Sequence, residues 1–182
     1  MTDVSGFLMG ISTAERLGVV RFVAQQGVAS MSEVAREWPA VPPYTLGGAA
    51  SALVRSGWLL ADGATTRRGT VVEVSPAAPR RLWTLLEELD PASRACEPVD
   101  VEDVLADLSV LRREATRDVL ARLAARDWTA AHPRELGLTI GRAWAGWAAL
   151  RRAGWMVDGQ VVLGRRSSLR ALLAELMWAV AA

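Results

Sequence analysis

Apolar residues recur every three or four positions along several stretches of the chain, which predicts amphipathic helices. The first helix is expected from about Thr13 to Gln26, and Gly27 follows it as a helix stop. A short helix over Glu33 to Trp38 and a third helix from Tyr44 to Ser56 come next, and Gly57 ends the third. The first part of the chain is therefore expected to hold three helices, the second of them capped by Ser30 or Ser32.

The pattern changes after the third helix. An apolar run, Trp58-Leu59-Leu60, and a β-branched run, Thr70-Val71-Val72-Glu73-Val74, flank the turn-forming pairs Asp62-Gly63 and Arg68-Gly69. Two apolar runs around turn residues are typical of a two-stranded hairpin with a loop. A closing helix is expected after Pro79.

The second half of the chain repeats this pattern. The block Ala52–Leu59 (ALVRSGWL) matches Ala149–Met156 (ALRRAGWM), and an Asp-Gly pair follows each within a few residues. The apolar positions of Leu82–Leu89 match those of Leu169–Leu176. Two matching blocks in the same order predict an internal duplication, with a shorter segment between the blocks in the second copy.

The second copy is expected to repeat the order helix, short helix, helix and hairpin, with a tight turn at its Asp-Gly pair. The helices are expected over residues 117–126, 133–137 and 140–153, and the strands over 155–157 and 160–163.

Residues 90–100 are rich in proline and small side chains, which predicts a linker. Apolar positions then form one stripe over residues 101–126, which predicts a long helix, either continuous or broken near Thr116. The expected domains are a first module at 1–89, the linker at 90–100, and a bridging helix with the second module at 101–182. The expected fold class is mainly α with small β-hairpins.

Composition limits the possible functions. The net charge is +1, with 21 basic residues, all arginine, against 20 acidic ones. Strong nucleic-acid binders usually carry a basic excess, so DNA binding here would have to come from a local arginine patch. One cysteine, Cys96, and one histidine, His132, allow neither an intramolecular disulfide nor a zinc site built from several such ligands.

No targeting or catalytic pattern stands out. The N-terminus lacks the features of a signal peptide, and Arg170 and Glu175 interrupt the apolar tail at 169–182, so a cytoplasmic protein without membrane contact is expected. His132 precedes Pro133, which is expected to open a helix. The sequence contains no Gly-x-Ser-x-Gly nucleophile elbow whose serine His132 could activate. We therefore predict no catalytic residue, no metal and no cofactor.

Three blocks carry a family resemblance: Ala14–Val20 (AERLGVV), Ser32–Ala35 (SEVA) and Ala52–Leu59. They resemble the ArsR/MarR-type winged helix-turn-helix regulators, and equally the N-terminal dimerisation domain of bacterial small-molecule O-methyltransferases. The resemblance covers about residues 7–89, with a weaker copy at 115–177. It implies tandem winged helix-turn-helix modules joined by the long helix.

Two departures limit what the resemblance implies. A methyltransferase would continue into a Rossmann-like domain with a glycine-rich cofactor loop, and the sequence has no such strand, loop and helix. Metal-sensing ArsR proteins use paired cysteines, which this chain lacks. Neither S-adenosylmethionine chemistry nor metal sensing is expected.

The third helix of a winged-helix module usually enters the DNA major groove. In the first copy its exposed side is expected to offer Tyr44, Thr45, Ser51 and Arg55, and the wing offers Arg67 and Arg68. These are few side chains for a helix and wing that would recognise DNA. The Gly47-Gly48 pair in the same helix costs about 1 kcal/mol of helix propensity per glycine, for which close packing is the ordinary explanation.

The second copy has more arginines at the corresponding positions. The residues expected to contact DNA are Arg142, Arg151, Arg152, Arg165 and Arg166. The ordinary alternative is that these arginines are simply solvated.

Trp144 and Trp147 lie three residues apart and share a face of the helix. They are expected either to pack in the core or, if exposed, to form a patch for a partner or an aromatic ligand.

The leading hypothesis is a DNA-binding transcriptional regulator that acts as a homodimer on double-stranded DNA. The alternative is a non-catalytic interaction, dimerisation or small-molecule-binding protein, in which the tryptophans hold a protein or an aromatic ligand. A contiguous positive surface along the second module would favour the first hypothesis. A closed apolar cavity lined by Trp144 or Trp147 would favour the second.

Overall fold

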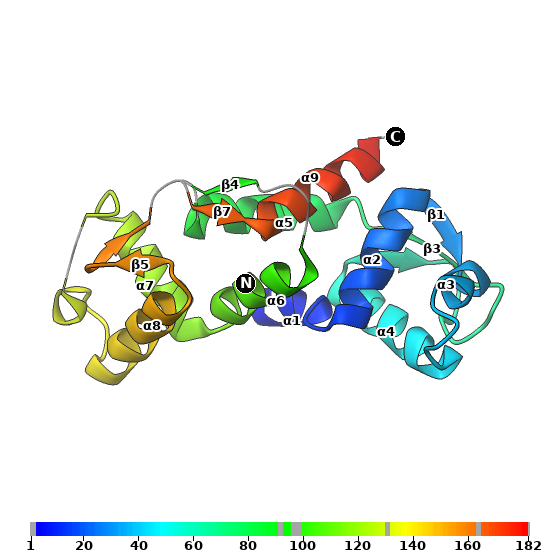
Figure 1. Ribbon diagram of the computed structural model, residues 1–182, viewed down its shortest axis with the longest axis horizontal. Helices are drawn as coiled ribbons and strands as arrows, with labels where there is room; N and C mark the ends of the chain where they lie inside the picture. The colour runs from blue at the N-terminus through cyan, green and yellow to red at the C-terminus, as the bar shows by residue number, and fades with distance from the viewer. Residues whose placement is uncertain (1–2, 91–92, 96–99, 130–131, 163–164, 182) are drawn as a thin grey trace. The chain divides into compact units, whose positions relative to one another are not determined.

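The computed structural model describes residues 3–90, 93–95, 100–129, 132–162 and 165–181. The chain is mainly helical with small sheets, as the sequence pattern predicts (Figure 1). It divides into two compact units, one formed by Met1–Leu82 with Leu172–Ala182 and the other by Trp83–Ala171. These borders differ from the repeat-based ones, because the C-terminal residues belong with the first unit.

The three predicted helices of the first unit form close to their expected bounds. They are α2 (Ala14–Gln26), α3 (Met31–Glu37) and α4 (Pro43–Ser56). Ser30, not Ser32, caps α3, because the Glu33 carboxylate accepts a hydrogen bond from the Ser30 N–H while Ser30 Oγ accepts one from the Glu33 N–H. A further helix, α1 (Val4–Gly10), precedes them.

The first unit holds a three-stranded antiparallel sheet instead of the predicted two-stranded hairpin. Its strands are β1 (Val28–Ser30), β2 (Leu59–Ala61) and β3 (Val71–Val74), in the order β1-β3-β2. Leu17, Leu53 and Trp58 are fully buried and join α2, α4 and the sheet into one core. The last turns of helix α9 (Ser168–Ala181) complete this unit.

The segment between the repeats contains ordered structure where a linker was predicted. Helix α5 (Ala77–Leu89) begins two residues before Pro79 and is followed by Asp90, which is buried. Strand β4 (Arg94–Ala95) then pairs in parallel with β7 (Arg166–Ser167).

Of the two forms expected over residues 101–126, continuous or broken, the structure has the broken one, as helices α6 (Val101–Leu111) and α7 (Glu114–Ala124). The break is at Arg112 and Arg113, before Thr116, because Arg113 takes an extended conformation. Arg117 Nη1 donates to the carbonyls of Leu111 and Arg112, each at 2.7 Å, and so satisfies the end of α6.

The second copy follows its predicted order. It comprises the 3₁₀ turn η1 (Pro133–Glu135), helix α8 (Ile140–Arg152) and the hairpin of β5 (Met156–Val157) with β6 (Gln160–Val161). Asp158 and Gly159 both have positive φ, the conformation of a two-residue type I′ turn. None of the helices in the described residues is both long enough and apolar enough to cross a membrane.

Candidate nucleic-acid interface

The loop between β2 and β3 is fixed to helix α4. Thr65 Oγ1 hydrogen bonds to the Gly47 carbonyl at 3.3 Å and to Ser51 Oγ. A Cβ at Gly47 would lie 3.3 Å from the Thr65 carbonyl oxygen, whereas one at Gly48 would meet nothing within 4 Å. Close packing therefore explains Gly47, and nothing in the structure explains Gly48.

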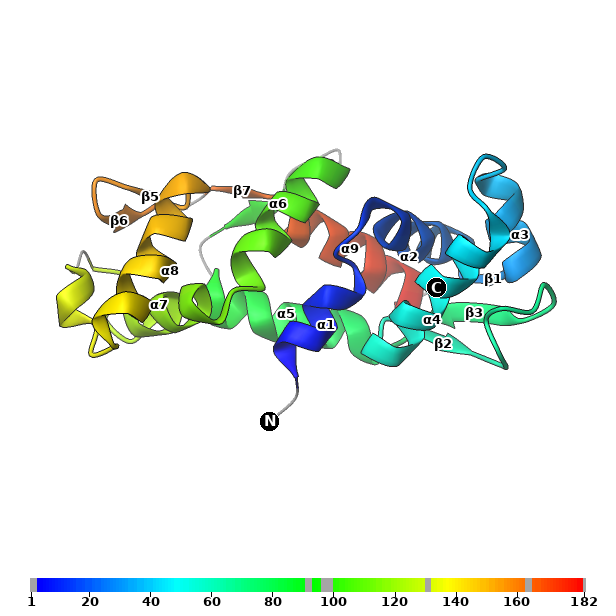
Figure 2. The ribbon, with the colours of Figure 1, turned by 90° about the horizontal axis from the view of Figure 1, so that it is seen from below.

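The same loop is also fixed to the start of α3. Ser32 donates to the Arg68 carbonyl from its N–H at 3.0 Å and from its hydroxyl at 2.8 Å. The side chains of Arg67 and Arg68 are exposed at this point of the loop. The loop that carries Arg67 and Arg68 is thus held to α3 and α4, and Figure 2 shows the course of this part of the backbone.

The other residues predicted in the first copy lie along α4. Tyr44 is 81% exposed in the first turn, and Thr45 beside it is half-buried. Arg55 is exposed eleven residues further on, about 16 Å along the helix axis. Tyr44 and Thr45 are therefore close to the loop anchored at Gly47, while Arg55 belongs to the other end of α4.

In the second unit, Arg142 is neutralised by helix α7. Its guanidinium forms ion pairs with Glu114 and Asp118, which lie one turn apart on that helix. The hydrogen bond to Glu114, with a further one to Asp118, raises the pKa of Arg142. A phosphate approaching Arg142 would also approach these two carboxylates, which weakens the prediction that Arg142 contacts DNA.

Arg165 is largely enclosed and paired with two carboxylates, which weakens the prediction that it contacts DNA. Its side chain is 10% exposed and pairs with Asp90 at 2.5 Å and with Asp107 at 2.9 Å. The guanidinium also lies 3.5 Å from the ring centre of Trp155. Burial raises the pKa of both Asp90 and Asp107, and the positive charge of Arg165 opposes that rise.

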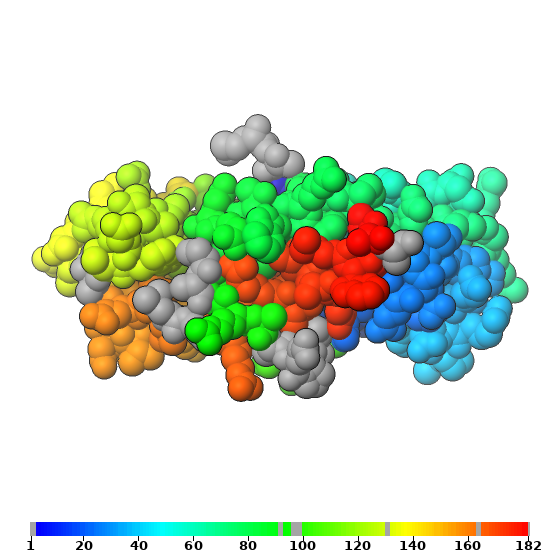
Figure 3. Space-filling view, turned by 90° about the horizontal axis from the view of Figure 1, so that it is seen from above, coloured from blue at the N-terminus to red at the C-terminus, as the bar shows by residue number. Residues whose placement is uncertain are grey.

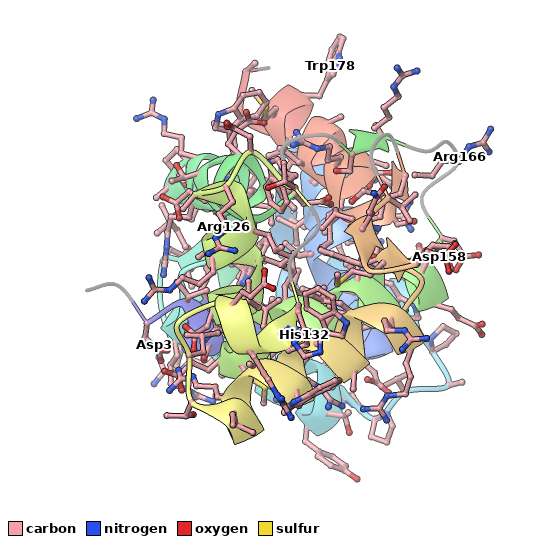
Figure 4. The ribbon with its side chains drawn as sticks, turned by 90° about the vertical axis from the view of Figure 1, so that its left-hand side faces the viewer. Asp3, Arg126, His132, Asp158, Arg166 and Trp178 are labelled. Atoms are coloured by element: carbon pink, nitrogen blue, oxygen red, sulfur yellow. The ribbon has the colours of Figure 1, made fainter. Side chains whose placement is uncertain are left out.

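The remaining predicted arginines, Arg151, Arg152 and Arg166, are exposed. Arg166 points away from the ribbon in Figure 4. Between Arg142 and Arg151, the exposed positions of α8 are Trp144, Ala145 and Ala148, which offer no phosphate-binding group apart from the indole N–H. The described residues therefore place no contiguous positive surface along α8.

The two tryptophans of α8 have different environments. Trp147 is only 6% exposed and packs in the core, whereas Trp144 is 44% exposed. Trp144 meets the His132 ring edge-to-face at 5.6 Å, and His132 Nδ1 caps η1 by accepting from the Arg134 N–H. Both tryptophans, His132 and Arg151 line a groove of about 480 Å³. Figure 4 labels His132.

Sequence reasoning missed the cluster of Arg165 with Asp90 and Asp107. Adjacent arginines at 165 and 166 give no indication of which one pairs with the two carboxylates. Cys96 lies outside the described residues, and no three His, Cys, Asp or Glu side chains among the described ones are grouped to hold a metal ion.

Searches of protein-family models, of curated proteins and of solved structures find no match for this chain.

Proposed function

We propose that the protein is a cytoplasmic DNA-binding regulator built from two winged helix-turn-helix modules, and that the first unit carries the DNA contacts. The order α2-β1-α3-α4-β2-β3, with the sheet order β1-β3-β2, supports a winged-helix assignment for this unit. In that assignment α4 is the recognition helix and the β2–β3 loop is the wing.

The anchored wing is the observation that carries the proposal. Its bonds to Gly47 and Ser32 hold Arg67 and Arg68 beside the exposed first turn of α4. In this proposal Tyr44 and Thr45 face the major groove, while the two arginines of the loop bind backbone phosphates. The near-neutral net charge fits a surface with only a few phosphate contacts.

In this proposal the second unit has a different role. Its described residues contain no strand equivalent to β1, and two of its five predicted arginines are held by carboxylates. A supporting role, such as holding a partner or a second copy of the chain, agrees better with this arrangement than reading DNA.

We also propose that the protein acts as a homodimer. The C-terminal half of α9 lies at the surface (Figure 3) and exposes Met177, Trp178 and Val180 by 50%, 79% and 40%. Trp178 points outward in Figure 4. A cluster of large exposed apolar side chains is a common feature of association surfaces, and sedimentation of the Trp178→Glu variant against the wild type would test this one.

Fluorescence anisotropy with a labelled mixed-sequence duplex tests the proposed DNA site. Replacing Arg67 and Arg68 by alanine should weaken binding about tenfold or more and reduce the slope of log Kd against log salt by about 2, one for each lost phosphate contact. Replacing Arg151 and Arg152 by alanine removes the same charge from the second unit and should leave most of the binding.

A third pair, Arg112→Ala with Arg113→Ala, controls for net charge, because both residues are exposed at the α6–α7 break. If all three double variants bind alike, the wing assignment is wrong. If only the Arg151 and Arg152 pair loses binding, the second unit carries the contacts. Absence of duplex binding by the wild type at low salt would exclude the DNA-binding proposal itself.

The groove beside Trp144 favours a second candidate function, the holding of an aromatic small molecule or partner side chain. It combines a half-exposed indole, the His132 ring and the cation of Arg151. Quenching of tryptophan fluorescence by aromatic compounds in the wild type, and its loss in Trp144→Ala, would support this candidate. Quenching that is unchanged in that variant would exclude the groove.

A further inference from the structure

A separate group of arginines surrounds a pocket in the first unit. The pocket has a volume of about 500 Å³ and is lined by α1, the first turn of α2, the C-terminal end of α4 and the start of α5. Arg16, Arg55 and Arg81 line it together with a single carboxylate, that of Asp3. The sequence pattern singles out only Arg55 among them, and only as a DNA contact.

Two of these arginines are held in place by neutral partners. Arg16 Nη1 donates to the Met9 carbonyl at 3.0 Å. The Arg81 guanidinium lies 4.2 Å from the centre of the Phe7 ring, which itself stacks on Trp58 at 4.3 Å. Trp58 is fully buried and donates its indole N–H to the Phe7 carbonyl at 2.7 Å. One wall of the pocket is therefore a pair of buried, stacked rings, against which Arg81 packs.

The charges of these three arginines are not neutralised within the described part of the chain. None of them forms an ion pair with a described carboxylate. The Asp3 carboxylate accepts a hydrogen bond from the Gly6 N–H at 2.8 Å and caps α1. Three guanidinium groups around one concavity repel each other, and an anion between them would relieve that repulsion.

The pocket also has an apolar side. Met9 is 44% exposed at its edge, and Ala52 of α4 lines it. Its volume lies in the range of small-molecule sites, about 300–1,000 Å³. Guanidinium groups bind carboxylate and phosphate oxygens in a two-pronged geometry that suits a planar or tetrahedral oxyanion.

We propose that this pocket binds a small organic anion. The carboxylate or phosphate group of the ligand contacts Arg16, Arg55 and Arg81, and its apolar body lies against Met9 and Ala52. The site goes beyond DNA binding and does not depend on it, because the residues that line it exclude Tyr44, Thr45, Arg67 and Arg68.

Isothermal titration of the full chain tests the site with four probes. Phenyl phosphate and phenylacetate carry both an anionic group and an apolar body, while inorganic phosphate and acetate carry the anionic group alone. The first two should bind more tightly than the last two, and the better of the two shows whether a phosphate or a carboxylate is preferred.

Arg55→Gln is the main variant, since Arg55 is exposed and its loss leaves the core intact. It should weaken binding of the better aromatic probe about 10- to 100-fold. Arg81→Gln should have a similar effect, with circular dichroism as the check on its fold. Arg36→Gln, in the same unit but outside the pocket, is the matched control and should bind like the wild type.

Two results would overturn the site. One is equally weak binding of all four probes, which is the behaviour of a general cationic surface. The other is equal binding by Arg55→Gln and Arg36→Gln. Either result leaves the DNA-binding proposal standing, because that proposal is measured separately on the Arg67 and Arg68 variants.

Discussion

Arg165 lies between two buried carboxylates, and this arrangement governs the local electrostatics of the second unit. Asp90 and Asp107 together carry one negative charge more than Arg165 balances. Removing the cation from such a group leaves uncompensated buried charge, whereas removing one carboxylate leaves a matched pair. Removing the cation should therefore destabilise the protein far more than removing one carboxylate.

We predict that Arg165→Met lowers the free energy of unfolding by about 3–5 kcal/mol at neutral pH, while Asp107→Asn changes it by less than about 1 kcal/mol. The amide of the asparagine can still accept the hydrogen bond that Arg165 Nη1 gives to Asp107. Urea unfolding followed by circular dichroism measures both. Equal losses in the two variants would contradict the prediction.

The same cluster predicts a pH dependence. Since burial raises the pKa of Asp90 and Asp107, the folded protein keeps their protons at pH values where the unfolded chain has released them. The free energy of unfolding should therefore fall as the pH rises from about 4, the ordinary aspartate pKa, through the raised pKa values. Asp107→Asn should flatten this fall and Arg165→Met should steepen it, as urea unfolding at several pH values would show.

At the scale of elements, three helical glycines should respond differently to alanine. Gly48→Ala should stabilise the protein by about 0.5–1 kcal/mol, because its Cβ meets nothing within 4 Å and alanine is the better helix former. Gly47→Ala should gain less, because its Cβ would crowd the Thr65 carbonyl. Gly146→Ala should lose about 1–3 kcal/mol or more, because its Cβ would lie 2.2 Å from the carbonyl oxygen of Ala115. Thermal unfolding of the three variants checks the order.

The sequence predicts well those helices that are determined by residues close to one another in the chain. Helices α2, α4 and α8 follow from apolar spacing, and the capping pair of Ser30 and Glu33 marks the start of α3. Strand β1 escapes prediction because it has only three residues and alternation needs more. The apolar stripe continues unchanged across Arg113, so spacing alone cannot reveal the break between α6 and α7.

The candidate sites depend on pairings that no local pattern contains. The largely enclosed Arg165 pairs with Asp90, which lies 75 residues earlier in the sequence. Arg16 and Arg81 meet at one pocket although 65 positions separate them in the sequence, a distance over which periodicity carries no information. Conversely, the loop position of Arg67 and Arg68 is predicted correctly, because the flanking turn residues locate the loop.

For the whole molecule, the repeat and the compact units divide the chain differently. The repeat gives a first module at residues 1–89, but the first unit also includes Leu172–Ala182. Within it, Arg21 forms a two-pronged ion pair with Glu175 at 2.9 and 3.0 Å, and Leu173 and Leu176 of α9 are buried. Duplicated sequence therefore does not imply that each copy folds alone.

We predict that a fragment of residues 1–89 is incompletely folded on its own, because it lacks the apolar residues of α9 and the carboxylate that pairs with Arg21. It should bind a hydrophobic dye and unfold with a broad transition, and a peptide of residues 165–182 added in excess should sharpen that transition. The full chain with Arg21→Met is the control for the ion pair alone, which is partly exposed and should contribute at most about 1 kcal/mol. Cooperative unfolding of the bare fragment, without dye binding, would favour the repeat-based border over the compact unit.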